Sequence, residues 1–391
     1  MTMLNQYKNK MIEIFKMAEE VHRQTGRSYL TQAQDIRKLC RANSTCRIWD
    51  YYKLGIYQHE NVNARLARSY LGESSLAAAS VALNPRHAVT AAWDKLVFDM
   101  IAQLHDLPTA HNMAVFKPAS ALPSYIPQPL HTRKSLVRFL SNPSSYPLFM
   151  KPAHAQQNIG GYYLDSYNPS TDTVSVGASS ELTLSNLIET TIDLQSDLYD
   201  RSAGYLFQTP VKQHDLLTSV TGTSAPSGLR FIVLQDQHSS TPKIHRCIMK
   251  LVRQGNYSDN FHSGKNGNMI AYIDPATGSL SQAVTGYWPF AVAHQFHPTT
   301  GYDLLNLKIP MWSKIVDTVL KASSVFATMK ILHWDVLVGP EGPVLLELND
   351  LGSTSFVQLH GTGLMDDFMT DFMRRNGQLK HHKDIRNLTG Q

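Results

Sequence analysis

The chain has 391 residues, of which 42% are hydrophobic and 17% are charged. This composition can bury a sizeable core and excludes global disorder. The 36 Lys and Arg residues exceed the 31 Asp and Glu residues by a formal charge of +5, which is too small over this length to indicate a nucleic-acid-binding protein. The length favours two or three packed units over one.

The cysteines and the apolar runs indicate a cytoplasmic protein. Cys40, Cys46 and Cys247 are odd in number and have no CxxC spacing, which argues against a disulfide framework and a structural zinc site. The first residues carry no continuous apolar stretch, so we expect no signal peptide. No run reaches the ~18 apolar residues that span a bilayer, so we expect no membrane partner.

Residues 1–85 are predicted to form a helical N-terminal region. Apolar residues recur at spacings of three and four, which is typical of an amphipathic helix, at Met11, Ile14, Phe15, Ala18 and Val21. A second helix is predicted from about Tyr57 to Leu71. The pair Asn84-Pro85 ends the region.

Residues 86–205 change from helix to strand along their length. Helices are predicted over Val89–Leu104, Ser135–Leu140 and Leu182–Leu194. Strands are predicted in NMAVF, in PLFMKPA and, as a pair around an Asn-Pro turn, in GYYLDSYNPSTDTVSVG.

Residues 206–391 are predicted to be rich in strands. The β-prone segments are GYLFQTPV, which begins just before this region, GLRFIVLQD, KIHRCIMKLV, the hairpin MIAYIDPATGSL and the closing hairpin HWDVLVGPEGPVLLELN. A long helix is predicted over Met311–Met329, and the polar, basic tail from Arg374 is expected to fray. The chain is therefore predicted to be an α+β protein.

The closing hairpin carries the strongest chemical signal. Glu347 and Asn349 are two residues apart, so they share a face of one strand. With a turn over Gly339–Pro343, Asp335 on the first strand lies opposite Glu347. Two facing carboxylates repel unless a cation compensates them, and carboxylate and amide oxygens are the ligands that magnesium prefers. We expect a metal site here rather than a solvated acidic hairpin.

Lys151 and a glycine pair give a second, weaker signal. Lys151 ends the buried strand LFMK. The segment AHAQQNIGGYYL follows, in which Gly160 and Gly161 would let backbone amides approach phosphate oxygens. Lys95 lies within an apolar helix and by itself indicates no more than a surface lysine.

These segments, in this order, resemble the sugar-transfer-associated branch of the ATP-grasp superfamily, which is related in layout to glutamate-ligase-like enzymes. The resemblance covers most of the chain and runs through YYKLGIYQH, WDKLVFDMIAQLHDLPT, FMKP, GYLFQTPVKQH, GLRFIVL, SDNFHSGKNGNMIAYIDPATG, HPTTGYDLLNLKIPMW and WDVLVGPEGPVLLELN. It implies an ATP-grasp fold, in which two α+β subdomains, 86–205 and 206–391, clasp ATP behind the helical region 1–85.

The resemblance also implies roles for individual residues. The nucleotide-binding set is Lys95 and Lys151 for the phosphates, Gly160 and Gly161 in the covering loop, and Phe207, Gln208 and Thr209 in the strand whose backbone meets the adenine. Arg230 would face the transferred phosphoryl group or the acid, and Lys151 would share in catalysis. The magnesium ligands would be Asp335, Glu347 and Asn349, and Asn260 would line the substrate side. His154 follows Lys151 by three residues, and its position allows either a contact with substrate or no role.

Two segments depart from the family pattern. The loop AHAQQNIGG has fewer glycines than many phosphate-covering loops, and Ser227-Gly228-Leu229 precedes Arg230 where relatives often have a small residue or an Asn-Thr pair. Gln208 stands near positions that often hold a glutamate for the ribose.

The activity implied is ATP- and Mg²⁺-dependent ligation of a small-molecule carboxylate to an amine through an acylphosphate. The substrate would be an amino acid, amino sugar or sugar acid in polysaccharide or specialised-metabolite biosynthesis. A small-molecule kinase and a non-catalytic nucleotide-binding protein are the alternatives. We expect no nucleic-acid partner, and the sequence leaves the oligomeric state open.

Overall fold

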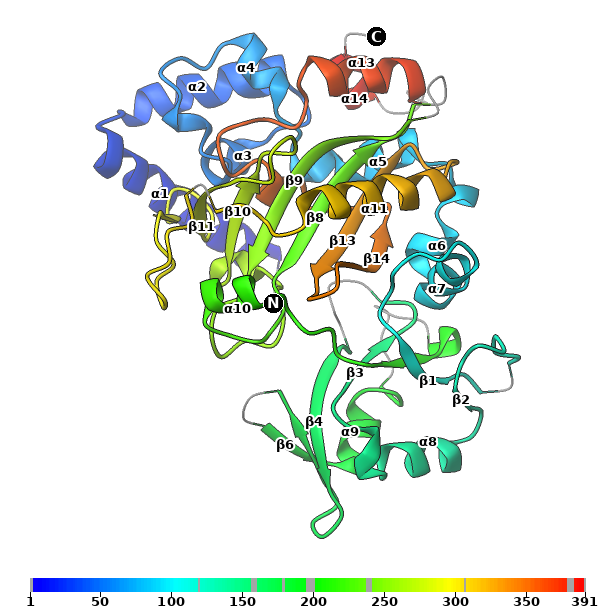
Figure 1. Cartoon of the computed structure of the whole chain (residues 1–391). Helices are drawn as coiled ribbons and strands as arrows, with labels where there is room; N and C mark the ends of the chain where they lie inside the picture. Colours follow the sequence, from blue (N-terminus) through cyan, green and yellow to red (C-terminus); the bar gives the residue numbers. More distant parts are fainter. Residues whose placement is uncertain are drawn as a thin grey trace.

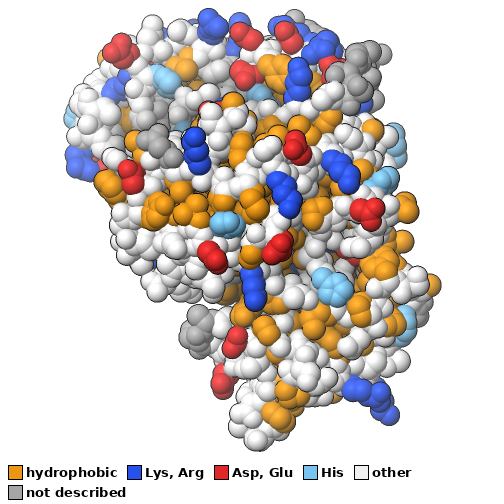
Figure 2. All heavy atoms as spheres, viewed as in Figure 1, with side chains coloured by type: hydrophobic (Ala, Val, Ile, Leu, Met, Phe, Trp, Pro, Cys, Tyr) orange, Lys and Arg blue, Asp and Glu red, His pale blue; other side chains and the backbone are white. Residues whose placement is uncertain are grey.

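The computed structural model describes residues 3–118, 120–155, 160–177, 180–194, 201–236, 241–305, 307–377 and 383–389. Within these residues, a helical N-terminal region and two seven-stranded sheets make up the molecule (Figure 1). Acidic and basic side chains are interspersed over the face drawn in Figure 2. In the described part of the chain, no helix is both long and apolar enough to cross a membrane.

Five α-helices form the N-terminal region: α1 (Met3–Thr25), α2 (Tyr29–Ala42), α3 (Ile48–Lys53), α4 (Ala64–Ser69) and α5 (Leu76–Leu83). The helix expected over Tyr57–Leu71 is shorter than predicted. It begins only after Asn63, whose side chain caps α4 by accepting from the Leu66 amide. Fully buried aromatic rings, including Tyr51, Tyr57 and Tyr70, fill the core of the region.

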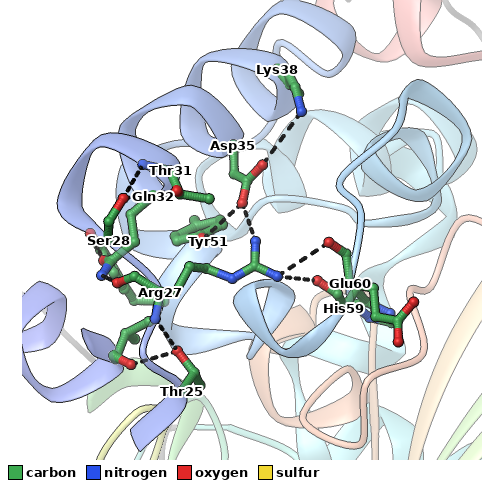
Figure 3. Close-up of polar contacts among 12 residues, drawn as sticks. Thr25, Arg27, Ser28, Thr31, Gln32, Asp35, Lys38, Tyr51, His59 and Glu60 are labelled. Carbon is green, nitrogen blue, oxygen red and sulfur yellow. Dashed lines mark hydrogen bonds and ion pairs between the residues drawn. The ribbon is translucent and has the colours of Figure 1, made fainter. Parts of the chain in front are cut away.

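A partly buried ion pair joins the helices of this region (Figure 3). The Arg27 guanidinium contacts the Asp35 carboxylate on α2 through Nη1. Its Nη2 donates to the backbone oxygen of His59 at 2.6 Å, and the Tyr51 hydroxyl on α3 donates to Asp35 at 3.4 Å. Because Arg27 follows α1, this one side chain fixes the end of α1 against α2 and the turn near His59.

The first sheet has the strand order β2-β1-β7-β3-β4-β5-β6. Its strands are β1 (Asn112–Phe116), β2 (Gln128–Leu130), β3 (Leu148–Pro152), β4 (Tyr162–Asn168), β5 (Thr173–Val176), β6 (Ser180–Thr183) and β7 (Tyr205–Gln208). The helices α8 (Arg133–Leu140) and α9 (Leu184–Thr190) share its apolar core. Every strand and helix predicted between Asn112 and Leu194 is present, and α9 is shorter than the predicted Leu182–Leu194.

The helix expected over Val89–Leu104 is two helices, α6 (Thr90–Trp93) and α7 (Lys95–Leu104). Asp94 breaks it because its backbone is extended and its carboxylate caps α7, accepting from the amides of Leu96 and Val97. Lys95 is thus the first residue of α7, and its amide donates to the Ala153 oxygen after β3.

The second sheet has the strand order β12-β11-β10-β9-β8-β13-β14. Its strands are β8 (Gly228–Leu234), β9 (Lys243–Leu251), β10 (Met269–Ile273), β11 (Leu280–Thr285), β12 (Val292–His294), β13 (Ile331–Val338) and β14 (Pro343–Asn349). One face packs against α7, α10 (Asp215–Thr221) and α11 (Trp312–Val325), where Trp334 contacts Phe98 and Phe326. The other face packs against α5 and the C-terminal helices.

Two expected boundaries differ from the structure. The expected boundary after residue 205 falls inside β7, which belongs wholly to the first sheet, and α7 packs on both sheets, with Phe98 on the second and Leu96 on the first. The tail was expected to fray from Arg374. Instead α13 (Asp367–Asn376) continues past it and is followed by α14 (Lys383–Thr389). Buried Ile385 and Leu388 hold α14 against the core, and α12 (Thr354–Val357) precedes both helices.

Candidate active site

Asp335 lies at the centre of a row of side chains on one face of the second sheet. Its register partners are Arg230 on β8 and Glu347 on β14. The predicted pairing of Asp335 with Glu347 is therefore confirmed, although the turn is one residue shorter than expected. Val338 pairs with Pro343, and an extra residue in β14, Leu346, shifts the register before Glu347.

Arg230 and Lys250 both contact Asp335. Arg230 donates through Nε and Nη2 to the two carboxylate oxygens, at 2.6 and 2.5 Å. The Nζ of Lys250 on β9 lies 3.4 Å from Asp335 Oδ1 and 2.8 Å from Asp259 Oδ2. Gly228 makes room for Asp259, because a Cβ at this glycine would lie 2.1 Å from Asp259 Oδ2. The four charged groups form an alternating network in which Lys250 and Asp335 are buried and Arg230 and Asp259 are partly exposed.

The cations determine the ionisation of the network. Burial alone would raise the pKa of Asp335, but the charges of Arg230 and Lys250 outweigh it and hold that pKa well below its usual range. Burial would likewise lower the pKa of Lys250, yet the carboxylates of Asp259 and Asp335 raise it. Asp335 is therefore ionised, and Lys250 charged, at neutral pH.

Glu347 connects the sheet to the first lysine of the predicted site. Lys95 Nζ lies 3.5 Å from Glu347 Oε2 and donates to the Ala155 oxygen at 2.8 Å. Asn349 Nδ2 donates to Glu347 Oε1 at 3.2 Å. This orientation leaves the Asn349 Oδ1 as the atom of that side chain able to ligate a cation.

Lys151 is buried in the first sheet and faces the same carboxylate. Burial lowers its pKa to about 8, and the charge of Glu347 opposes that shift while the charge of Lys95 adds to it. A buried ammonium group with no carboxylate in ion-pair contact within the described residues is suited to an anionic ligand. The structure thus brings together Lys95, Lys151, Arg230, Asp335, Glu347 and Asn349.

The residues predicted to bind magnesium fit that ion by donor type. All three side chains can offer oxygen, which is the ligand that Mg²⁺ takes in proteins. Among the residues that the structure describes, no group of three His, Cys, Asp or Glu side chains is arranged to hold a metal. The repulsion between Asp335 and Glu347, from which we inferred a metal, is compensated by Arg230, Lys250 and Lys95.

The side chains of the expected adenine-binding strand are engaged in the fold. Phe207 is fully buried and packs on Phe139, with ring centroids 5.2 Å apart. Gln208 is buried and donates to Asn112 Oδ1 at 2.9 Å. Strand β7 pairs on both sides, and the Thr209 amide donates to the His111 oxygen. A backbone contact to adenine is therefore left to the linker beyond Thr209.

The remaining predicted residues lie around this centre. Gly160 has a positive φ of 73°, and its oxygen accepts from the Tyr205 hydroxyl. Gly161 follows it before β4, and residues 156–159 of the same loop lie outside the described residues. The His154 ring stacks on Trp93, with centroids 5.7 Å apart. Asn260 follows Asp259 and accepts from Asn266 and Asn268 through its backbone oxygen.

Sequence reasoning missed Lys250 and Asp259. The alternation of β9 offered a signal, since Arg246, Ile248 and Lys250 fall on one side of the strand. In the structure, both basic residues of this row are buried. Lysine buried in a strand is rarely left without an acidic partner. No local spacing pointed to Asp259, because its loop returns to β9 only in the folded chain.

Comparison with known families decides which fold this is. A family model described as sugar-transfer associated ATP-grasp matches residues 79–370, more than half of the chain. The chain belongs to this family. The two α+β subdomains behind a helical N-terminal region are accordingly an ATP-grasp fold, as the sequence predicted.

Solved structures match this ATP-grasp chain at low identity. VanG D-Ala:D-Ser ligase from Enterococcus faecalis has a TM-score of 0.40 and 10% identity, over 75% of this chain and 64% of that one. D-alanyl-alanine synthetase A from Vibrio cholerae O1 has a TM-score of 0.41 and 11% identity, over 79% of this chain and 67% of that one. Biotin carboxylase from Campylobacter jejuni has a TM-score of 0.40 and 11% identity, over 79% of this chain and 48% of that one. The chain thus spans less than two thirds of the first of these proteins. No curated protein matches it.

Proposed function

We propose that this ATP-grasp chain is an ATP- and Mg²⁺-dependent ligase that joins a small-molecule carboxylate to an amine through an acylphosphate. The observation that carries the proposal is the convergence of four basic side chains, Lys95, Lys151, Arg230 and Lys250, on the row of Asp335 and Glu347. Family membership supports the ATP-dependent part, and the acid and the amine are further parts of the proposal.

In this proposal the basic residues hold ATP and its developing charge. Lys95 and Lys151 would bind the phosphates, and Arg230 and Lys250 would face the transferred phosphoryl group. A carboxylate oxygen attacks the γ-phosphorus while its bond to ADP breaks, and negative charge spreads over the phosphoryl oxygens. Cations that are already fixed stabilise that charge with little reorganisation. The amine then attacks the acyl carbon, phosphate leaves and the amine loses a proton.

Asp335, Glu347 and Asn349 would hold Mg²⁺. The ion, when bound, would neutralise charge on the ATP phosphates. Asp335 is already ionised by its basic neighbours, so it needs no proton loss to serve as a ligand. Arg230 and Lys250 contact Asp335 in this structure. A cation bound to Asp335 would replace these contacts, and both side chains could then bind phosphoryl oxygens.

Product analysis tests this function. The protein is incubated with MgATP and a panel of amino acids, amino sugars and sugar acids, singly and in pairs, and ADP, phosphate and coupled product are measured. A ligase releases ADP and free phosphate only when acid and amine are both present. Phosphate retained on an acceptor would indicate the kinase alternative. Absence of ATP binding in calorimetry would contradict every catalytic version.

We also infer the setting of the reaction from the family description. A family associated with sugar transfer supports an amino acid, amino sugar or sugar acid as substrate, in the biosynthesis of a polysaccharide or specialised metabolite. Assays of the panel against sugar acids and against plain amino acids separate these substrate classes. A cytoplasmic location accords with the free cysteines Cys40, Cys46 and Cys247.

A further inference from the structure

Arg246 is a buried basic residue that the proposed chemistry does not use. It lies on β9, 5% exposed, on the same face of the sheet as Lys250. Its Nη2 donates to the Gly363 oxygen at 2.8 Å, whereas its Nε is buried and has no hydrogen-bond partner. Among the described residues, Arg246 takes part in no ion pair, although Arg230 and Lys250 both do.

Aromatic and histidine side chains surround this guanidinium. Its Cζ lies 5.8 Å from the ring centroid of Tyr272 on β10. The ring centroid of His360 lies 6.5 Å from that of Tyr272, and the His360 Nε2 is also buried without a partner. In the register of the sheet, Arg246 and His333 flank Ile232 on either side, and the Nε2 of His333 is likewise buried and unpartnered. Burial lowers the pKa of His333 and of His360, so both rings are neutral and Arg246 carries the positive charge beside Tyr272.

The missing partner of Arg246 is an anion. A buried charge without a counter-charge is costly, so such groups in proteins are paired or bind a ligand. The Nε and Nη2 of a guanidinium form the edge that holds a carboxylate with two hydrogen bonds. Arg230 uses these same two atoms to hold Asp335. In Arg246 the Nε of that edge is unused and no protein carboxylate is in ion-pair contact within the described part of the chain.

Position relates this residue to the reaction centre. Arg230 pairs with Ile248, so Arg246 is its diagonal neighbour across β8 and β9, at about 7–8 Å between Cα atoms. Lys250, the diagonal neighbour of Arg230 on the other side of Ile248, reaches Asp335, whereas the Arg246 guanidinium is directed to the Gly363 oxygen and makes no ion pair with Asp335. A carboxylate held at Arg246 is therefore separate from the group beside Arg230 and Asp335. It is near enough to belong to the same small molecule or to the second substrate.

We propose that Arg246, beside Tyr272, forms a subsite for a substrate carboxylate that is not itself phosphorylated. This subsite rests on the proposed ligase function for its role in a reaction. The ligand of this subsite is a small molecule with a carboxylate that is remote from the new bond between acid and amine. The source is either a second carboxylate of the acid substrate or the carboxylate of an amino-acid amine substrate.

Ligand binding tests the subsite without turnover. Saturation-transfer NMR and calorimetry measure the dissociation constants of L-alanine, L-glutamate and D-glucuronate, each compared with its carboxamide, in the presence of ADP and magnesium. We expect at least one carboxylate to bind the wild-type chain and its carboxamide to bind about tenfold more weakly or worse, because a charge-assisted pair is lost. Binding of alanine would point to the amine substrate, and binding of glucuronate alone to the acid.

Variants assign the effect to Arg246. Arg246→Met, which has a side chain of similar length, is expected to raise the dissociation constant of the carboxylate ligand by about tenfold or more, while the affinity for MgATP stays within twofold. Arg138→Met, on the exposed face of α8, is the matched control and should change neither. If Arg246→Met does not fold by circular dichroism, Arg246→Lys keeps the charge but loses the two-pronged edge, and it is expected to bind the carboxylate about tenfold more weakly.

The outcomes separate this subsite from the function. Equal binding of carboxylate and carboxamide, binding of no carboxylate probe, or unchanged carboxylate affinity in both Arg246 variants would overturn the subsite. Failure of the wild-type chain to bind MgATP would overturn the proposed function, while a carboxylate affinity lost in Arg246→Met would still support the subsite.

Discussion

Lys250 and Asp259 form an ion pair, 2.8 Å between Nζ and Oδ2, directly beside the carboxylate of Asp335. Lys250→Met removes the only charge on that side chain and leaves Asp259 unbalanced. We expect kcat to fall by about 10²–10³-fold, because a fixed cation at the transferred phosphoryl group is lost, with a smaller change in the KM for ATP. Lys250→Arg should restore part of the rate. Lys265→Met, exposed in the loop after Asp259, should leave kcat unchanged. Equal rates in Lys250→Met and the wild type would exclude Lys250 from the chemistry.

Glu347 supports a prediction about magnesium. Glu347→Gln keeps the shape of the side chain but removes the charge that faces Lys95 and the predicted cation. We expect the magnesium concentration for half-maximal activity to rise by about tenfold and kcat to fall by about 10²-fold. Glu341→Gln, exposed in the turn of the same hairpin, is the control. An unchanged magnesium dependence in Glu347→Gln would contradict the assignment of this residue as a ligand.

Lys151 supports a prediction about pH. Its pKa of about 8 lies below that of a free lysine because the side chain is buried. The ammonium form, which would bind phosphate in the proposed function, is therefore populated below pH 8 and lost above it. The dissociation constant of a non-hydrolysable ATP analogue should rise between pH 8 and 9.5, approaching tenfold per pH unit. Lys151→Met should bind weakly at every pH in this range. A wild-type affinity that stays constant to pH 9.5 would show that Lys151 does not contact the phosphates.

Asp35 supports a prediction about stability. Asp35→Ala leaves the Arg27 guanidinium, 15% exposed, without its carboxylate. We expect the free energy of unfolding of the helical region to fall by about 3 kcal/mol, measured as a lower midpoint in thermal and urea unfolding. Glu19→Gln, exposed on α1, should leave the midpoint in place. Because the pair joins N-terminal helices that have their own core, whereas Asp335 lies on β13, ATP affinity below the transition should not change.

Much of this architecture was predictable because its signals are local. The strand sequences either alternate between apolar and polar residues or are continuously apolar. That Asp335 lies opposite Glu347 follows from one turn and from the two-residue repeat of side chains along a strand. The break in the helix at Asp94 was not predicted, since the apolar spacing continues through it and only the capping carboxylate interrupts it. Short 3-10 turns such as Ile56–Gln58 had no periodicity to predict them.

The parts of the site that were not predicted depend on distant segments. Asp259 meets Lys250 only when the loop after β9 folds back, and Gly228 matters because it leaves space for that carboxylate. The tail was expected to fray because it is polar and basic, yet two apolar side chains, Ile385 and Leu388, are enough to hold α14 in the core. Composition averaged over a segment conceals such sparse anchors.

The extra residue Leu346 has a consequence for how this family can vary. If the same residues paired without this register shift, the pairing of Val336 with Leu345 would continue and set Glu347 opposite Trp334, on the side of the sheet that packs against α7 and α11. Losing the bulge at constant length would thus place a negative charge in apolar packing and set Leu346 against Asp335, whereas deleting Leu346 would leave Glu347 facing Asp335 in regular pairing. The bulge and the number of residues between Asp335 and Glu347 can therefore change only together.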